Sequence, residues 1–206
     1  MVTSKSKTTK VKKPAKRRRS SKNDDPIELW QAYQAKPTIE LRNQLIEHYL
    51  PRAVENGQDV EARTQMLNAS CMAVNGYLAS LSATPVHNCS HAFGALYHIP
   101  HGDANGVFLP IVMECLPELY VPNAERLAQA LNMPRGDKTG EALLEDVIAN
   151  VRDIHQRVNC ATDLSRWNVT ADNMEAIIMA VASDPIGVFY PIPPEKIQEI
   201  TLKAIG

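Results

Sequence analysis

Four of the six histidines lie within fifteen positions, in the stretch ATPVHNCSHAFGALYHIPHGDAN that spans residues 83–105. His87 and His91 are four residues apart, so on a helix they project from one face, one turn above the other. His101 follows a tight turn at Ile99-Pro100 and opens a further helical pattern. Neutral imidazoles bind zinc, iron, copper or nickel. Convergence of these three side chains therefore predicts a metal site.

Other interpretations of the histidines stay open at this point. An H-x-x-x-H pair on a helix is more often a surface or structural pair than a metal site. We expect His98 to be an exposed loop residue, and we expect His48 and His155 to be solvated on the polar faces of their helices. Small residues around the imidazoles are expected to leave room for a substrate and a cofactor: Ser90, Ala92, Gly94 and Ala95.

The composition predicts an all-α fold, a helical bundle, around these histidines. The 206 residues are 44% hydrophobic and 22% charged, and aromatic residues are few while small and straight-chain apolar residues are plentiful. Alternating strand patterns of useful length are missing from the sequence. Helical spacing and capping residues predict helices at 26–36, 38–50, 59–81, 101–119, 123–133, 140–159, 170–183 and 193–206, and a short one ending near Gly94.

The helix that Asp59 opens has apolar residues at spacings of four and three, which predicts a buried face: Leu67, Cys71, Val74, Leu78 and Leu81. The four cysteines form no C-x-x-C pair, so we expect reduced, buried thiols in a cytoplasmic protein. No run approaches 18 apolar residues and no apolar segment follows the basic N-terminus, so neither a membrane span nor a secretory signal is predicted.

Charge divides the chain into a basic tail and an acidic remainder. Ten of the 22 Lys and Arg residues lie within 1–25, whereas residues 26–206 carry 12 basic and 21 acidic side chains. The tail has almost no apolar residues, and we expect it to be disordered. Residues 1–22 are predicted either to contact nucleic acid phosphates without sequence preference or to act only as a solvated tail.

The stretch HNCSHAFGALYHIPHGDAN resembles the metal-binding motif of the iron-containing, group III, alcohol dehydrogenases. The stretches AVENGQDVEARTQMLNAS, AERLAQALNM and ASDPIGVFYPIPPEKI resemble other parts of the same family, so the resemblance covers residues 53–206. It implies that His87 and His101 are ligands of Fe²⁺ or Zn²⁺, and that His91 is an active-site residue near the nicotinamide of NAD or NADP. It also implies hydride transfer between an alcohol and an aldehyde or ketone.

The sequence departs from the family pattern in two respects. The family has an N-terminal dinucleotide-binding domain with a Gly-rich turn, and this chain has no Gly before Gly57. The family's catalytic half begins with an Asp and a His, four residues apart, which complete the metal shell and have no counterpart here. We therefore expect a truncated dehydrogenase domain with an incomplete metal site, inactive alone. A further interpretation is a non-functional product whose exposed apolar surface favours association, for example into a homo-oligomer.

Residues 24–52, DDPIELWQAYQAKPTIELRNQLIEHYLPR, resemble the start of bacterial sigma factors of the flagellar and sporulation type. The chain is thus expected to be a chimera of a basic tail at 1–25, a two-helix sigma-factor-like segment at 26–52 and the dehydrogenase domain at 53–206. The alternative function that follows is an RNA polymerase or DNA interaction protein acting through residues 1–52.

Overall fold

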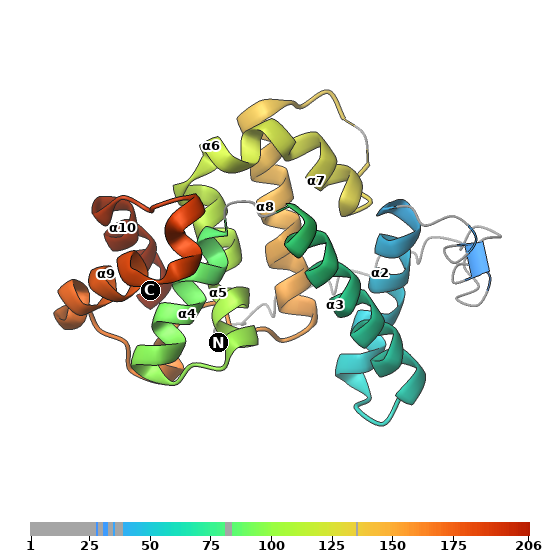
Figure 1. Ribbon diagram of the computed structural model, residues 1–206. Helices are drawn as coiled ribbons and strands as arrows, with labels where there is room; N and C mark the ends of the chain where they lie inside the picture. Colours follow the sequence, from blue (N-terminus) through green and yellow to red (C-terminus); the bar gives the residue numbers. More distant parts are fainter. Residues whose placement is uncertain (1–27, 29–30, 33–34, 36–38, 81–83, 135) are drawn as a thin grey trace, which may run out of the picture.

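The computed structural model describes residues 28, 31–32, 35, 39–80, 84–134 and 136–206 (Figure 1). Within these ranges the regular secondary structure is entirely helical and contains no strand, as the composition predicted. The predicted disordered tail, residues 1–25, lies outside the described residues.

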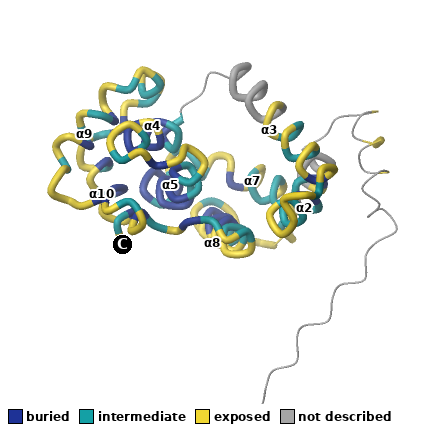
Figure 2. The backbone as a smooth tube through the Cα atoms, turned by 90° about the horizontal axis from the view of Figure 1, so that it is seen from below, coloured by how far each residue is buried: buried dark blue, intermediate teal, exposed yellow. Residues whose placement is uncertain are grey.

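Residues 84–206 form a helical body with α5 at its centre. Its α-helices are α4 (Pro85–Tyr97), α5 (His101–Cys115), α6 (Pro117–Tyr120), α7 (Ala124–Ala130), α8 (Gly140–Arg157), α9 (Met174–Ser183) and α10 (Pro194–Ile205). Short 3₁₀ turns connect some of them: η1 (Val121–Asn123), η2 (Ser165–Trp167), η3 (Ala171–Asn173) and η4 (Pro185–Phe189). Helices α4, α8 and α10 all pack on α5, whose backbone is the most continuously buried in Figure 2.

The core of the body is made mainly by the inner faces of α4, α5, α9 and α10. Val107, Phe108 and Val112 on α5 have no exposed surface. A second cluster joins α5 to α7 and α8, with Met113 and Val147 at its centre. Burial of this kind stabilises a helix far more than its intrinsic propensity does, and it fixes both helices that carry the predicted metal-site histidines.

Several helix ends differ from the sequence prediction. Helix α4 passes Gly94 and ends at Tyr97, where His98 adopts a left-handed conformation with φ 56° and donates its backbone N–H to the Gly94 oxygen. The helix predicted over 101–119 is broken at Leu116, because a residue that precedes a proline is disfavoured in the α conformation. The helix predicted over 170–183 begins with the 3₁₀ turn η3.

Helices α2 (Ile39–Glu55) and α3 (Val60–Ser80) form a separate pair at the other end of the molecule (Figure 1). Leu45, Tyr49 and Ala62 make the small core of this pair. The predicted helix end before Pro51 is wrong, since α2 continues through Pro51 to Glu55. A proline removes one backbone hydrogen bond from a helix, and here packing on α3 maintains the helix beyond it.

The turn between α2 and α3 is held by charged side chains. Asp59 caps α3 by accepting a hydrogen bond of 2.9 Å from the Ala62 N–H, which confirms the predicted start of this helix. The Arg52 guanidinium, from the last turn of α2, lies 2.8 Å from the carboxylate of Asp59 and 2.9 Å from that of Glu61. These contacts fix the antiparallel approach of the two helices.

The predicted buried face of α3 is wrong where the structure describes its side chains. Leu67 is 67% exposed and Cys71 is exposed, while the side chains of the other three predicted residues lie outside the described set. An apolar stripe is buried only where another element packs on it, and α3 packs on α2 through Ala62 and Met66. Among the other free cysteines Cys89 and Cys115 are buried, as predicted, and Cys160 is partly buried.

An apolar cavity of about 320 Å³ lies where α2 meets the body. Ile46, Leu50 and Pro51 line it from α2, and residues of α5, α7 and α8 line it from the other side. Closely packed helices leave few voids larger than a water molecule. Packing between α2 and the body is therefore incomplete at this point.

Candidate metal site

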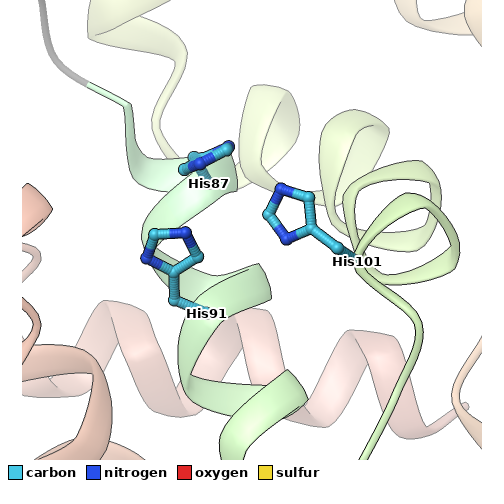
Figure 3. A group of neighbouring side chains, drawn as sticks. All are labelled: His87, His91 and His101. Atoms are coloured by element: carbon cyan, nitrogen blue, oxygen red, sulfur yellow. The ribbon is translucent and has the colours of Figure 1, made fainter.

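Helices α4 and α5 bring three histidines into one group (Figure 3). His87 and His91 lie one turn apart on α4, and His101 is the first residue of α5. The left-handed residue His98 and the extended Pro100 turn the chain sharply between the two helices. All three rings point into the shared space at this corner, as the sequence predicted (Figure 3).

The spacing of the three imidazoles is suitable for one metal ion. The ring centroid of His87 lies 4.5 Å from the centroid of His91 and 4.5 Å from that of His101. The centroids of His91 and His101 are 5.5 Å apart. One ligand nitrogen from each ring lies within 4.8 Å of the other two. Metal–imidazole bonds are about 2.0–2.1 Å long for zinc, so small rotations of the side chains would bring three nitrogens to a common ion.

Electrostatics keep His87 in the state that a metal ligand requires. Burial lowers the pKa of His87 below its ordinary value of 6.5, and positive charge on His91 or His101 would lower it further, while Asp184 acts in the opposite direction. The imidazole of His87 is therefore neutral near pH 7, which is the protonation state of a metal-binding histidine.

Asp184 contacts the group from outside, and the sequence analysis did not select it. Its Oδ2 lies 2.9 Å from His91 Nδ1, and its Oδ1 accepts a hydrogen bond of 2.8 Å from the Ile186 N–H. The side chain of Asp184 is only 12% exposed, compared with 41% for His91. The one local signal was an Asp before a Pro, typical of a turn start. Its contact with a histidine 93 residues away left no pattern in the sequence.

The floor of the site is closely packed. Asn88, next to His87 on α4, is 1% exposed and lies against η4, where a Cβ added to Gly187 would come within 2.6 Å of the Asn88 Nδ2. Ser90 and Ala92 are also buried. Gly94 is partly buried and Ala95 is exposed, and the expectation that these four small residues leave room for a substrate and a cofactor stays a prediction.

The three remaining histidines lie apart from the group. His98 is exposed, as expected. His48 and His155 are partly buried, which corrects the expectation that both are solvated. The Nε2 of His48 lies 2.9 Å from the guanidinium of Arg52, and burial lowers the pKa of His155, helped by the charge of Arg152.

With the geometry of the corner established, comparisons with known proteins identify the family. A family model described as "Fe-containing alcohol dehydrogenase family, C-terminal" matches residues 37–205. The chain belongs to this family. The match includes all three histidines of the corner and also α2, which lies largely within the segment 26–52 that was assigned to a sigma factor. The resemblance of residues 24–52 to sigma factors gains no support from the comparisons.

Two curated relatives illustrate the similarity in sequence. The chain is 26% identical over 144 residues to an NADPH-dependent butanol dehydrogenase of Clostridium saccharobutylicum, which covers 70% of this chain and 36% of the relative. It is 32% identical over 154 residues to alcohol dehydrogenase 4 of Schizosaccharomyces pombe, covering 73% of this chain and 35% of the relative. The chain thus spans about a third of the length of these two relatives.

Solved structures show the same fold. The NADH-dependent butanol dehydrogenase A of Thermotoga maritima matches with a TM-score of 0.68 at 20% identity, over 85% of this chain and 46% of that one. An alcohol dehydrogenase from Oenococcus oeni matches with a TM-score of 0.71 at 23% identity, over 89% of this chain and 46% of that one. The helical body of the iron-containing alcohol dehydrogenases is therefore the fold of this chain.

The helices were also compared with the requirements of a membrane span. Among residues 39–80, 84–134 and 136–206, no single helix is both long and apolar enough to cross a membrane. The segments His101–Cys115 and Pro117–Ala130 pass by length and composition only when taken together, and they are bent by 94° at their junction.

Proposed function

We propose that this chain is the metal-binding part of an NAD- or NADP-linked alcohol dehydrogenase, with His87 and His101 as ligands of Fe²⁺ or Zn²⁺. The observation that carries the proposal is the group of three imidazoles whose ligand nitrogens lie within 4.8 Å of one another. Nitrogen donors of this kind favour transition metals over Mg²⁺ or Ca²⁺. The family membership and the dehydrogenase names of the relatives support the same class of reaction.

The residues of this chain would hold and orient the reacting groups. When bound, a divalent ion supplies Lewis-acid polarisation of the oxygen of an alcohol, aldehyde or ketone. His87 is held by the buried floor of α4, and His101 by the start of α5. By resemblance to the family, His91 faces the nicotinamide of NAD or NADP. The sequence contains no Gly-rich phosphate turn, so we expect the purified 206-residue chain to show no alcohol-dependent reduction of NAD or NADP.

Metal content tests the proposal directly. The chain, freed of any affinity tag, is stripped with a chelator and titrated with Zn²⁺ and, without oxygen, with Fe²⁺. We expect one ion per chain, and a loss of affinity of more than about 100-fold in His87→Ala and in His101→Ala, since loss of a ligand costs more than the 10 to 100-fold typical of an outer-shell change.

The matched control is His98→Asn, because His98 is an exposed histidine of the same segment, and Asn tolerates its left-handed backbone. This variant should bind metal like the wild type. Absence of stoichiometric metal in the wild type, or unchanged affinity in both ligand variants, would contradict the proposal.

The alternative function, nucleic acid or RNA polymerase binding through residues 1–52, stays a prediction. It is supported by the ten basic residues within 1–25, and these lie outside the described residues. Deletion of residues 1–22 should abolish any salt-dependent DNA binding while leaving the metal content unchanged.

A further inference from the structure

We propose that the apolar cavity between α2 and the body binds one uncharged small molecule with a hydrocarbon body and a hydroxyl group, and that Asn150 accepts the hydrogen bond of this hydroxyl. The cavity has a volume of about 320 Å³ and is lined from α2, α5, α6, α7 and α8. None of its described lining residues belongs to α4, and those on α5, Leu109 and Met113, lie in later turns of the helix than His101. The inference therefore concerns a site apart from the histidine corner and does not rest on metal binding.

The walls of the cavity are suited to a hydrocarbon. Leu50 of α2, Leu127 of α7, and Val147 and Ile154 of α8 are among the apolar residues that line it. An apolar cavity of about 150 Å³ takes up benzene, and ordered water needs two to four polar partners. A cavity of about twice that volume, with walls that supply few polar groups, therefore has room for a larger apolar molecule and holds water poorly.

Asn150 places a polar group in this apolar wall. It lies on the same face of α8 as Val147, Val151 and Ile154, which also line the cavity. The Oδ1 atom of Asn150 is buried, and no described group of the chain donates a hydrogen bond to it. A buried amide oxygen without a partner destabilises a fold. A ligand that donates a hydrogen bond to this oxygen would remove the destabilisation.

The charges around the cavity favour an uncharged ligand. Arg157 is the one charged residue among the described residues that line it, and its guanidinium lies 3.8 Å from the carboxylate of Asp153. Burial raises the pKa of Tyr120, so the phenol at the wall stays neutral. A carboxylate cannot donate a hydrogen bond to Asn150, and an ammonium group would leave water without a negative charge to pair with. A hydroxyl is the smallest uncharged group that can make this bond.

A molecule bound in the cavity would join α2 to the body. Leu50 and Ile46 contribute the wall on α2, and α2 contacts α7 beside the cavity (Figure 1). A ligand that binds only the folded arrangement raises the unfolding midpoint as its concentration rises. Occupancy of the cavity should therefore stabilise the packing of the α2–α3 pair on the body.

The test compares two isomers, 1-octanol and 1-methoxyheptane, by isothermal titration calorimetry on the full 206-residue chain without a tag. A chelator in the buffer keeps the chain free of metal, so that no ion at the histidine corner can hold the alcohol. We expect one molecule of 1-octanol per chain. The ether has the same atoms and no O–H to donate to Asn150, so it should bind about 5 to 100-fold more weakly.

Three variants locate the ligand and its hydrogen bond. Asn150→Leu removes the acceptor and keeps a side chain of similar size, so it should weaken 1-octanol binding by about 5 to 100-fold and change ether binding by less than about 3-fold. Ala130→Phe fills the cavity from α7 and should abolish binding of both isomers. Ala149→Leu is the control and should bind like the wild type, because Ala149 is exposed on α8 and does not line the cavity.

The side-chain amide of Asn150 gives a second measurement of the same contact. Its nitrogen-15 and proton resonances can be assigned by their loss in Asn150→Leu. They should shift on saturation with 1-octanol and shift much less with the ether, since only the alcohol donates a hydrogen bond to Oδ1.

Each outcome decides one part of the inference. Equal affinity for the two isomers would overturn the role of Asn150. Absence of saturable 1-octanol binding in the metal-free chain, or unchanged binding in Ala130→Phe, would overturn the cavity as the site and leave the proposed metal binding standing. Thermal unfolding followed by circular dichroism checks that each variant is folded, and the wild-type midpoint should rise more with 1-octanol than with the ether.

Discussion

The α4–α5 corner and the α2–α3 pair are each two helices joined by a short turn, yet they are buried very differently. In the corner, Phe108 has no exposed surface and α5 is covered by α4, α8 and α10. In the pair, Val60 and Leu67 are 71% and 67% exposed, and an apolar cavity of about 320 Å³ lies between α2 and the body. The difference shows that helical periodicity predicts that a segment is a helix. It does not predict whether another element packs on the apolar face of that helix. His87, His91 and His101 lie in the corner, where the apolar faces of both helices are covered.

The largest expected effect comes from the core of the corner. Phe108→Ala should lower the free energy of unfolding by about 3–5 kcal/mol, because Phe108 is fully buried and its ring centroid lies 4.7 Å from that of Phe93. Metal affinity should fall with it, since α5 carries His101. Urea unfolding and Zn²⁺ titration measure the two effects.

Tyr49→Ala is the matched change in the α2–α3 pair, where Tyr49 is 1% exposed. It should remove helix from the circular dichroism spectrum and leave Zn²⁺ stoichiometry unchanged. Loss of metal binding in Tyr49→Ala would show that the two regions fold as one unit.

A smaller effect is expected from tight packing in the body. A Cβ at Gly106 would come within 2.5 Å of Cys160 Sγ. Gly106→Ala should therefore cost about 1–3 kcal/mol from overpacking, offset in part by roughly 0.8–1.0 kcal/mol of helix propensity. Cys160→Ala removes the clashing atom, so a double-mutant cycle in urea should give a favourable coupling energy of about 0.5–3 kcal/mol.

Gly57→Ala is the control from the turn of the α2–α3 pair, where no other described atom lies within 4 Å of the added Cβ. It should be neutral or stabilise by up to about 1 kcal/mol. A coupling energy near zero between Gly106 and Cys160 would mean that the body is no more tightly packed than the pair.

Acid should weaken the body before it weakens the α2–α3 pair. Burial lowers the pKa of His87 and of His155 below 6.5, so their contribution to stability is complete above pH 6.5 and is lost as the pH falls through the lowered pKa values. A hydrogen bond from the Ala62 N–H, with Arg52, holds the pKa of Asp59 below 3.8, so the contribution of Asp59 to stability is complete above pH 3.8 and is lost only as the pH falls from there through the lowered pKa.

Urea unfolding of the metal-free chain at pH 7.5 and 5.0 measures this difference. In a Trp30→Phe background, the fluorescence of Trp167 reports on the body alone. The unfolding midpoint should be lower at pH 5.0, and His155→Gln should reduce the shift. A midpoint independent of pH would contradict the inference that partial burial lowers the pKa of these two histidines.

The smallest effect is expected on the outer face of α3. Leu67→Gln should change the free energy of unfolding by less than about 0.5 kcal/mol, because the side chain is 67% exposed. Urea unfolding gives the value. A decrease in the free energy of unfolding as large as that caused by a core substitution would mean that this face is covered in solution, by a second copy of the chain or by another partner.

Much of the site could be predicted from the sequence because its geometry is local. His87 and His91 are one helical turn apart whatever surrounds them, and the Ile99-Pro100 turn brings His101 back to the same corner. The all-helical fold and most helix starts were predicted for the same reason. Helix ends were less predictable, because α2 runs through Pro51 with the support of α3, and α4 extends past Gly94.

The sequence by itself determined the helices of this protein and the approach of its three histidines, because both depend on residues within a few turns of each other. Only the tertiary structure decided which helix faces are buried, and that Asp184 reaches His91 across 93 residues. Such contacts depend on how distant helices pack, and packing is governed by the total burial of the chain. The exposed Leu67 and the half-buried His155 follow from the same cause.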